Sequence, residues 1–167
     1  MAVVFDANIL IDLFNEKLKG DRRIKLDFLV KSLEKSRTKI LIPTPSLTEL
    51  LVGADKARSS YFQKINSTPV FAVEPFDNRA ALECSILLEA AWSKSDQRKI
   101  SHSKFKFDWQ IVSIAASRNA TAIYSDDGDI ERAARHASIP VYKTSDLPLP
   151  ESARQGEIIF NPHPDQE

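Results

Sequence analysis

The sequence has few cysteines and glycines, no excess charge of either sign and no long apolar run. Its one cysteine, Cys84, excludes an internal disulfide framework and a thiolate metal cage and fits a reducing compartment. With four glycines, the chain shows no glycine-rich phosphate loop. No apolar run approaches the roughly 20 residues of a membrane helix, and the N-terminus does not resemble a signal peptide. We therefore expect a soluble, cytoplasmic protein.

Charge cancels over the whole chain but not along it. The 23 basic and 23 acidic side chains exclude a polycation that binds nucleic acid by bulk electrostatics. Residues 17–39 nevertheless carry nine bases against three acids, residues 94–107 carry five against one, and residues 146–167 carry one against five. Each segment could be a solvated helix face or loop. Two basic stretches that flank an acidic site could also grip a polyanion.

The hydrophobic pattern predicts strands that alternate with helices. Strands are expected at residues 2–6, 39–42, 70–73, 122–124 and 141–142. Helices are expected from about residue 8, at 21–35, from 46, at 57–65, at 77–92, from 108 and at 129–136. This alternation implies an α/β fold with a parallel sheet and helices on both faces. The pattern thins after Leu147, so we expect one domain over 1–147 and a tail, or a segment docked on a partner, over 148–167.

Acidic residues stand where the predicted strands end. Asp6 closes the first strand, Glu49 lies in the first helical turn after the second, Asp108 begins a helix, and Asp127 and Asp129 follow the fourth strand. In an open parallel sheet, ligands bind at the carboxyl ends of the strands. Carboxylates gathered there would raise one another's pKa unless a divalent cation neutralised them. Oxygen ligands select Mg²⁺ or Mn²⁺ over Zn²⁺, and such an ion can promote phosphodiester hydrolysis.

Most of these acids also have a purely structural interpretation. Glu49 stands three residues after Ser46, which is the spacing of a capping box. Asp108 and Asp127 could each be a helix N-cap. Asp129 could interact favourably with a helix dipole. The sequence leaves both interpretations open for each of these residues.

Asp6 and Asn8 differ from the other polar candidates. An aspartate that closes an apolar strand at the start of the domain has no obvious structural partner in the sequence. Asn8 either caps the first helix or supports a metal ligand from outside the coordination shell. Asp6 is therefore the strongest single candidate for a functional carboxylate.

Four short segments that carry these residues resemble the PIN-domain nucleases, and in particular the VapC-type toxins of bacterial and archaeal toxin–antitoxin pairs. In chain order they are residues 4–10 (VFDANIL), 45–51 (PSLTELL), 107–115 (FDWQIVSIA) and 123–130 (IYSDDGDI). Together they span most of the chain in the family's order. The resemblance implies a PIN-like three-layer α/β/α fold with a central parallel sheet. Haloacid-dehalogenase and receiver-type folds are weaker alternatives.

The same resemblance implies a set of site residues. The implied acidic quartet around Mg²⁺ or Mn²⁺ is Asp6, Glu49, Asp108 and Asp127. Asp129 would be an auxiliary acid, and Asn8 and Ser125 would be supporting polar residues. The family more often has Thr, a variable residue and Asp where this chain has Ser125, Asp126 and Asp127, which leaves open whether Asp126 or Asp127 reaches the metal.

The implied reaction is hydrolysis of a phosphodiester bond in RNA by a metal-activated water. The bases expected to contact flanking phosphates are Arg98, Lys99, Lys104 and Lys106. A small antitoxin protein is the implied partner, and a homodimer stays open. Two alternatives remain, namely an inactive PIN-fold module that binds RNA or protein, and a housekeeping RNA-processing nuclease.

Aromatic residues alternate with these bases. Phe105, Phe107 and Trp109 could stack on unpaired nucleotides. Ordinary core packing is the alternative, and we favour it for Phe107 and Trp109. The exposure of these side chains distinguishes the two interpretations.

Overall fold

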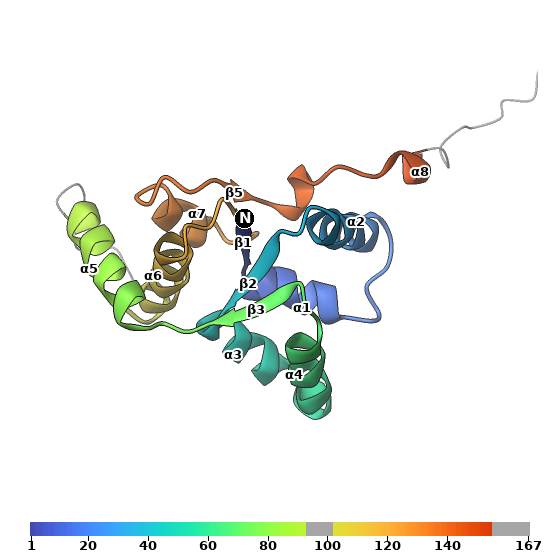
Figure 1. Ribbon diagram of the computed structural model, residues 1–167, viewed down its shortest axis with the longest axis horizontal. Coiled ribbons are helices and arrows are strands. Elements are labelled where there is room, and N and C mark those ends of the chain that lie inside the picture. The colour runs from blue at the N-terminus through green and yellow to red at the C-terminus, as the bar shows by residue number, and fades with distance from the viewer. Residues whose placement is uncertain (93–101, 155–167) are drawn as a thin grey trace, which may run out of the picture.

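The central layer of the protein is a parallel sheet. The computed structural model describes residues 1–92 and 102–154 (Figure 1). In this part of the chain the strands are β1 (Ala2–Phe5), β2 (Lys39–Pro43), β3 (Phe71–Glu74), β4 (Ile123–Tyr124) and β5 (Val141–Tyr142). They lie in the order β3-β2-β1-β4-β5, and every neighbouring pair is parallel. The predicted strands and the predicted parallel sheet are confirmed.

Helices connect these strands. They are α1 (Ala7–Phe14), α2 (Asp21–Lys35), α3 (Thr44–Gly53), α4 (Arg58–Ser67), α5 (Asn78–Trp92), α6 (His102–Ser117), α7 (Gly128–Ala134) and α8 (Glu151–Arg154). Two short 3₁₀ turns, η1 (Asp55–Ala57) and η2 (Thr144–Asp146), complete the described elements. Helix α3 begins two residues earlier than predicted, because Pro45 is tolerated in a first turn, where its missing N–H has no helical partner.

Alternate residues of the strands pack into two separate hydrophobic cores. Val3 and Phe5 of β1 pack with residues of α1, α2 and α3, whereas Val4 between them packs with residues of α5, α6 and α7. This alternation is the period of two expected of a strand that is buried on both faces. Figure 1 shows α5, α6 and α7 to the left of the strands and α1, α2 and α4 to the right. The predicted three-layer α/β/α arrangement is confirmed.

The strand order creates a switch point beside β1. From β1 the chain builds outward through β2 to β3, and it then crosses to the other side of β1 to form β4 and β5. In parallel sheets of this kind, ligands bind outside the carboxyl ends of the strands where the order reverses. Because Phe5 pairs with Tyr124, Asp6 and the residues that follow β4 leave the sheet together at this edge.

The predicted domain boundary falls at Leu147, which is buried and belongs to the core on the α2 side of the sheet. Helix α8 follows it, and residues 155–167 lie outside the described residues. The boundary therefore stays a prediction. Within the described ranges, no helix combines the length and the apolar character needed to cross a membrane.

Candidate active site

Asp6 lies at the switch point and is 5 % exposed. Its Oδ1 accepts hydrogen bonds from the Ala7 backbone N–H at 2.7 Å and from Ser46 Oγ at 3.3 Å. Its Oδ2 accepts from Asn8 Nδ2 at 2.8 Å and from Ser125 Oγ at 2.7 Å. A carboxylate offers about four acceptor positions, so these neutral donors satisfy it.

The charge of Asp6 is not matched by these partners. Burial raises the pKa of Asp6, and the hydrogen bonds from Ser125, Ala7 and Ser46 oppose that rise. The negative charge of Asp127 raises the same pKa further. The site therefore favours either a proton or a cation next to Asp6.

Ser125 connects the loop after β4 to this carboxylate. Its fully buried hydroxyl donates to Asp6 Oδ2 and accepts from Asn8 Nδ2 at 3.2 Å and from the Asp127 backbone N–H at 3.0 Å. One donor and two acceptor positions are all that a hydroxyl offers. Ser125 is thus a hub that fixes Asp6, Asn8 and Asp127 relative to one another.

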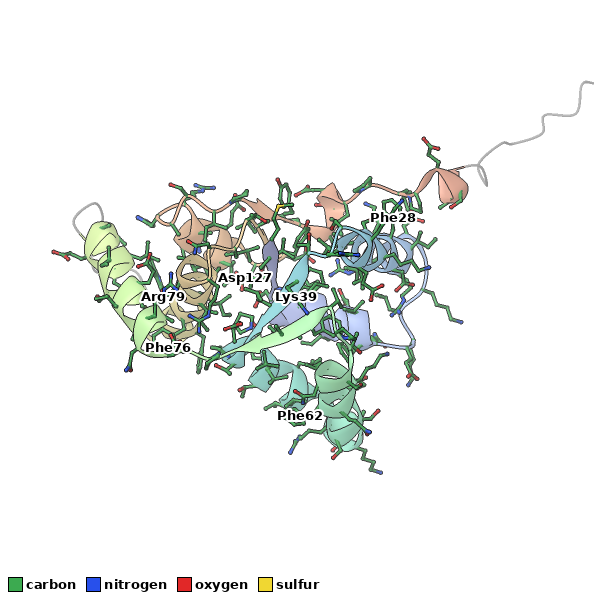
Figure 2. The ribbon with its side chains drawn as sticks, viewed as in Figure 1. Phe28, Lys39, Phe62, Phe76, Arg79 and Asp127 are labelled. Carbon is green, nitrogen blue, oxygen red and sulfur yellow. The ribbon has the colours of Figure 1, made fainter. Side chains whose placement is uncertain are left out.

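The N-termini of α1 and α7 show which residues cap these two helices. Asp127, which is labelled in Figure 2, is the N-cap of α7. It accepts from the Asp129 backbone N–H at 2.7 Å, so the capping interpretation of Asp127 is confirmed. Asp6, rather than Asn8, caps α1. Capping by Asn8 was the wrong interpretation, because the helix begins one residue earlier and the Asn8 side chain turns back to Asp6 and Ser125. Asp129 lies in the first turn of α7 and forms an ion pair with Arg132.

The structure excludes the capping interpretation of Glu49 and Asp108. Helix α3 begins at Thr44, so Ser46 is no N-cap, and its buried hydroxyl contacts Asp6 instead. Glu49 follows one turn after Ser46, on the same side of α3. Helix α6 begins at His102, so the prediction that Asp108 starts a helix is wrong; Asp108 lies in the second turn.

The neighbours Asp126 and Asp127 have different partners. Asp126 Oδ2 accepts from Arg22 Nη2 at 2.7 Å and from Thr144 Oγ1 at 2.9 Å, and its Oδ1 accepts from the Thr144 backbone N–H at 2.8 Å. The charge of Asp127 contributes to the raised pKa of Asp6.

Comparison with known proteins identifies the family. The PIN domain matches residues 3–136, which is most of the chain. The chain belongs to the PIN-domain family. No curated protein matches it.

Solved structures share this PIN fold at low sequence identity. A chain of the VapBC2 complex of Rickettsia felis, bound to a DNA fragment from its promoter, aligns with a TM-score of 0.62 and 18 % identity over 86 % of this chain and 98 % of that chain. The DNA-bound VapBC of Salmonella typhimurium gives 0.61 and 17 % over 86 % and 98 %. VapC20 of Mycobacterium tuberculosis, a toxin that cleaves the sarcin–ricin loop, gives 0.52 and 18 % over 78 % and 94 %.

PIN-domain nucleases generally use divalent metals. The carboxylate oxygens at this site are donors that suit such ions. Among the described residues, no three of the Asp, Glu, His and Cys side chains are arranged to hold a metal ion. Ser125 links the Asp6 carboxylate to the backbone of Asp127. Glu49 and Asp108 belong to α3 and α6, two helices that contact each other.

The predicted RNA contacts are only partly described. Arg98 and Lys99 lie outside the described residues, as do the side chains of Lys104, Lys106 and Phe105. Trp109 is 7 % exposed and its ring lies 5.4 Å from that of His136, so core packing is confirmed there. Phe107 is 51 % exposed, and the prediction of core packing for it is wrong.

The sequence did not identify three side chains that support this site, namely Ser46, Arg22 and Thr144. The Ser46–Glu49 spacing places both residues on one helix face, but a capping box accounts for the same spacing, so the sequence does not single out Ser46 as a partner of Asp6. Arg22 and Thr144, which hold Asp126, come from segments with no local sign of a link to the loop after β4. Their role depends on contacts between residues distant in the chain.

Proposed function

We propose that this PIN-domain protein is a divalent-metal-dependent endoribonuclease and the toxin of a toxin–antitoxin pair. The observation that carries the proposal is the Asp6 carboxylate, which is buried at the carboxyl edge of the central strand and has only neutral hydrogen-bond donors among the partners described above. Burying a charge in such surroundings is costly unless a cation compensates it. A divalent ion provides that compensation with oxygen ligands only.

The proposed ligands of Mg²⁺ or Mn²⁺ are Asp6, Glu49, Asp108 and Asp127, with Asp129 as an auxiliary acid. Asn8 and Ser125 orient Asp6 through the hydrogen bonds described above. Asp126 is assigned a structural role, because Arg22 and Thr144 already engage it. For the choice that the sequence left open between Asp126 and Asp127, we therefore propose Asp127 as the ligand.

Binding of the ion to Asp6 requires one of the present donors to give way. The Ser46 contact is the longest of the four, at 3.3 Å, and is therefore the weakest and the one that we expect to yield. When bound, the ion would lower the pKa of a water molecule and neutralise charge on the scissile phosphate. The carboxylates of the chain would hold the ion and orient that water, while Asn8 and Ser125 keep Asp6 in place.

The proposal of RNA as the substrate, and of a small antitoxin as the partner, is supported by the proteins that share the fold. VapC20 cleaves the sarcin–ricin loop, and the Rickettsia and Salmonella structures are VapBC complexes. The proposed RNA contacts are Arg98, Lys99, Lys104 and Lys106, and the proposed location is the cytoplasm. The domain proposed for this activity is 1–147.

The test is cleavage of RNA by the purified chain. Wild type should cut RNA with Mg²⁺ or Mn²⁺ and not with EDTA, and Asp6→Asn should cut at least about 100-fold more slowly, the scale for loss of a central electrostatic group. Asp27→Asn is the matched control, because Asp27 is a partly exposed aspartate on α2 that pairs with Arg23. Equal rates for Asp6→Asn and wild type would overturn the proposal.

Asp108→Asn separates the enzyme from a binding module. Since Asp108 does not cap α6, its substitution should lower cleavage without removing a cap. RNA binding that needs no metal, with no cleavage in any variant, would support the inactive module instead. Cleavage without growth arrest on expression, and without a small co-purifying protein, would support a housekeeping nuclease.

A further inference from the structure

Arg22 links three segments that are far apart in the chain. From α2, its Nε donates to Asp12 Oδ2 of α1 at 2.5 Å, and its Nη2 donates to Asp126 Oδ2 in the loop after β4 at 2.7 Å. The Arg22 side chain is 41 % exposed, and the carboxylates of Asp12 and Asp126 are 20 % and 29 % exposed. The planar guanidinium can hold two carboxylates at once in fixed directions, which an ammonium cannot do.

Asp126 is held from a second side as well. Thr144, a buried residue of η2, donates to Asp126 through both its backbone N–H and its hydroxyl. The backbone N–H of Asp126 in turn donates to Asn8 Oδ1 at 3.2 Å. Both the side chain and the backbone of Asp126 are therefore tied to other elements.

These contacts fix how the loop presents its two neighbouring residues. Arg22 and Thr144 hold the Asp126 side chain. The Ser125 hydroxyl donates a hydrogen bond to Asp6 and accepts one from the backbone N–H of Asp127. A rotation of the loop that released Asp126 would also move Ser125 and Asp127, because the three are consecutive. The contacts that hold Asp126 therefore also restrict the movement of Ser125 and Asp127.

We propose that Arg22 is a positioning residue that, through Asp126, holds Ser125 and Asp127 in place next to Asp6. Its effect on metal affinity and cleavage rests on the function proposed above, whereas its effect on the loop does not. Partly exposed ion pairs contribute little to overall stability, so the loss of Arg22 should act on the loop rather than on global unfolding.

The test compares Arg22→Met with Arg23→Met. Arg23 is the next residue of α2, and it pairs with Asp27 and donates to the Leu13 carbonyl, so its substitution removes a similar surface interaction without touching the loop. The first measurement is hydrogen exchange of the Asp126 and Asp127 backbone amides by NMR, because both donate hydrogen bonds within the loop. Exchange should be at least about tenfold faster in Arg22→Met and unchanged in Arg23→Met.

The second measurement is Mn²⁺ affinity by calorimetry, together with kcat and KM for RNA. Substitutions that disturb the support of metal ligands typically cost 10–100-fold in affinity, and Arg22 acts one residue further away, so we expect about a threefold to tenfold loss. The kcat should fall with little change in KM. The positioning role is wrong if the Asp126 and Asp127 amides exchange at the same rate in Arg22→Met as in Arg23→Met. Faster exchange in a protein whose wild type neither binds Mn²⁺ nor cleaves RNA would leave the positioning role standing and refute the proposed function.

Discussion

Removal of the Ser125 hydroxyl should destabilise the protein more than any loss of volume explains. Ser125→Ala takes away one hydrogen bond to the Asp6 carboxylate, a bond to a charged group that contributes about 1.5–3 kcal/mol. It also removes the acceptor of Asn8 Nδ2 and of the Asp127 N–H, and a buried donor left unsatisfied costs about 1–3 kcal/mol. Asn8 keeps its bond to Asp6, and water can reach the partly exposed Asp127, so we expect a total of about 2–4 kcal/mol.

The assay is equilibrium urea unfolding at neutral pH in EDTA, where metal does not contribute. Ser113→Ala is the matched control, because Ser113 is equally buried but its hydroxyl only donates to the Trp109 carbonyl within α6. Hydrogen bonds from a serine hydroxyl to a carbonyl of its own helix stabilise little. The free energy of unfolding of Ser113→Ala should therefore lie within about 0.5 kcal/mol of the wild-type value. Ser125→Thr retains the hydroxyl and should retain most of the stability. The hub role of Ser125 is refuted if Ser125→Ala and Ser113→Ala are equally stable.

Two further predictions concern pH. Because burial raises the pKa of Asp6, the folded state without metal gains stability as pH falls from above that pKa towards the unfolded value of about 3.9, and loses it as pH rises. The unfolding free energy of wild type relative to Asp6→Asn should therefore fall as pH rises in EDTA; a constant difference across pH would contradict this. Beside the edge strand β3, Arg118 bonds to Asp77 at 2.7 Å and to Glu74 at 2.6 Å, and it lowers the pKa of Asp77. The stability that Asp77 contributes is lost as pH falls below about 3.9, so Arg118→Met should show a shallower acid decline in unfolding curves than wild type, and parallel curves would rule out the ion pair.

The sequence could predict the parts of this fold that have a local signature. β1 and β2 are short apolar runs followed by turn or capping residues, and a strand buried on both faces is visible as such a run. The same local logic placed Asp6 and Asp127 at the ends of strands. The start of α6 was missed because Asp108 is a good N-cap residue, while the preceding residues 102–107 carry bases and aromatics that showed no clear helical stripe.

The supporting contacts of the site could not be predicted, because they join residues that are distant in the chain. Ser46 reaches Asp6 across 40 residues, and Arg22 reaches Asp126 across 104. In sequence, Ser46 fits a capping box with Glu49 equally well. Only the packing of α3 against α1 shows that its hydroxyl faces the carboxylate instead.

The position of β1 in the middle of the sheet has a consequence for the timing of synthesis. Asp6 precedes Ser125, its closest hydroxyl donor, by 119 residues, and β1 pairs with β4 only through residues equally late in the chain. A growing polypeptide therefore carries Asp6 through a long stretch of synthesis before Ser125 and β4, which complete the surroundings of its carboxylate, have been made. Contacts of such long sequence separation also form slowly. Truncated translation products that end before β4 would therefore lack this arrangement of Asp6 and Ser125.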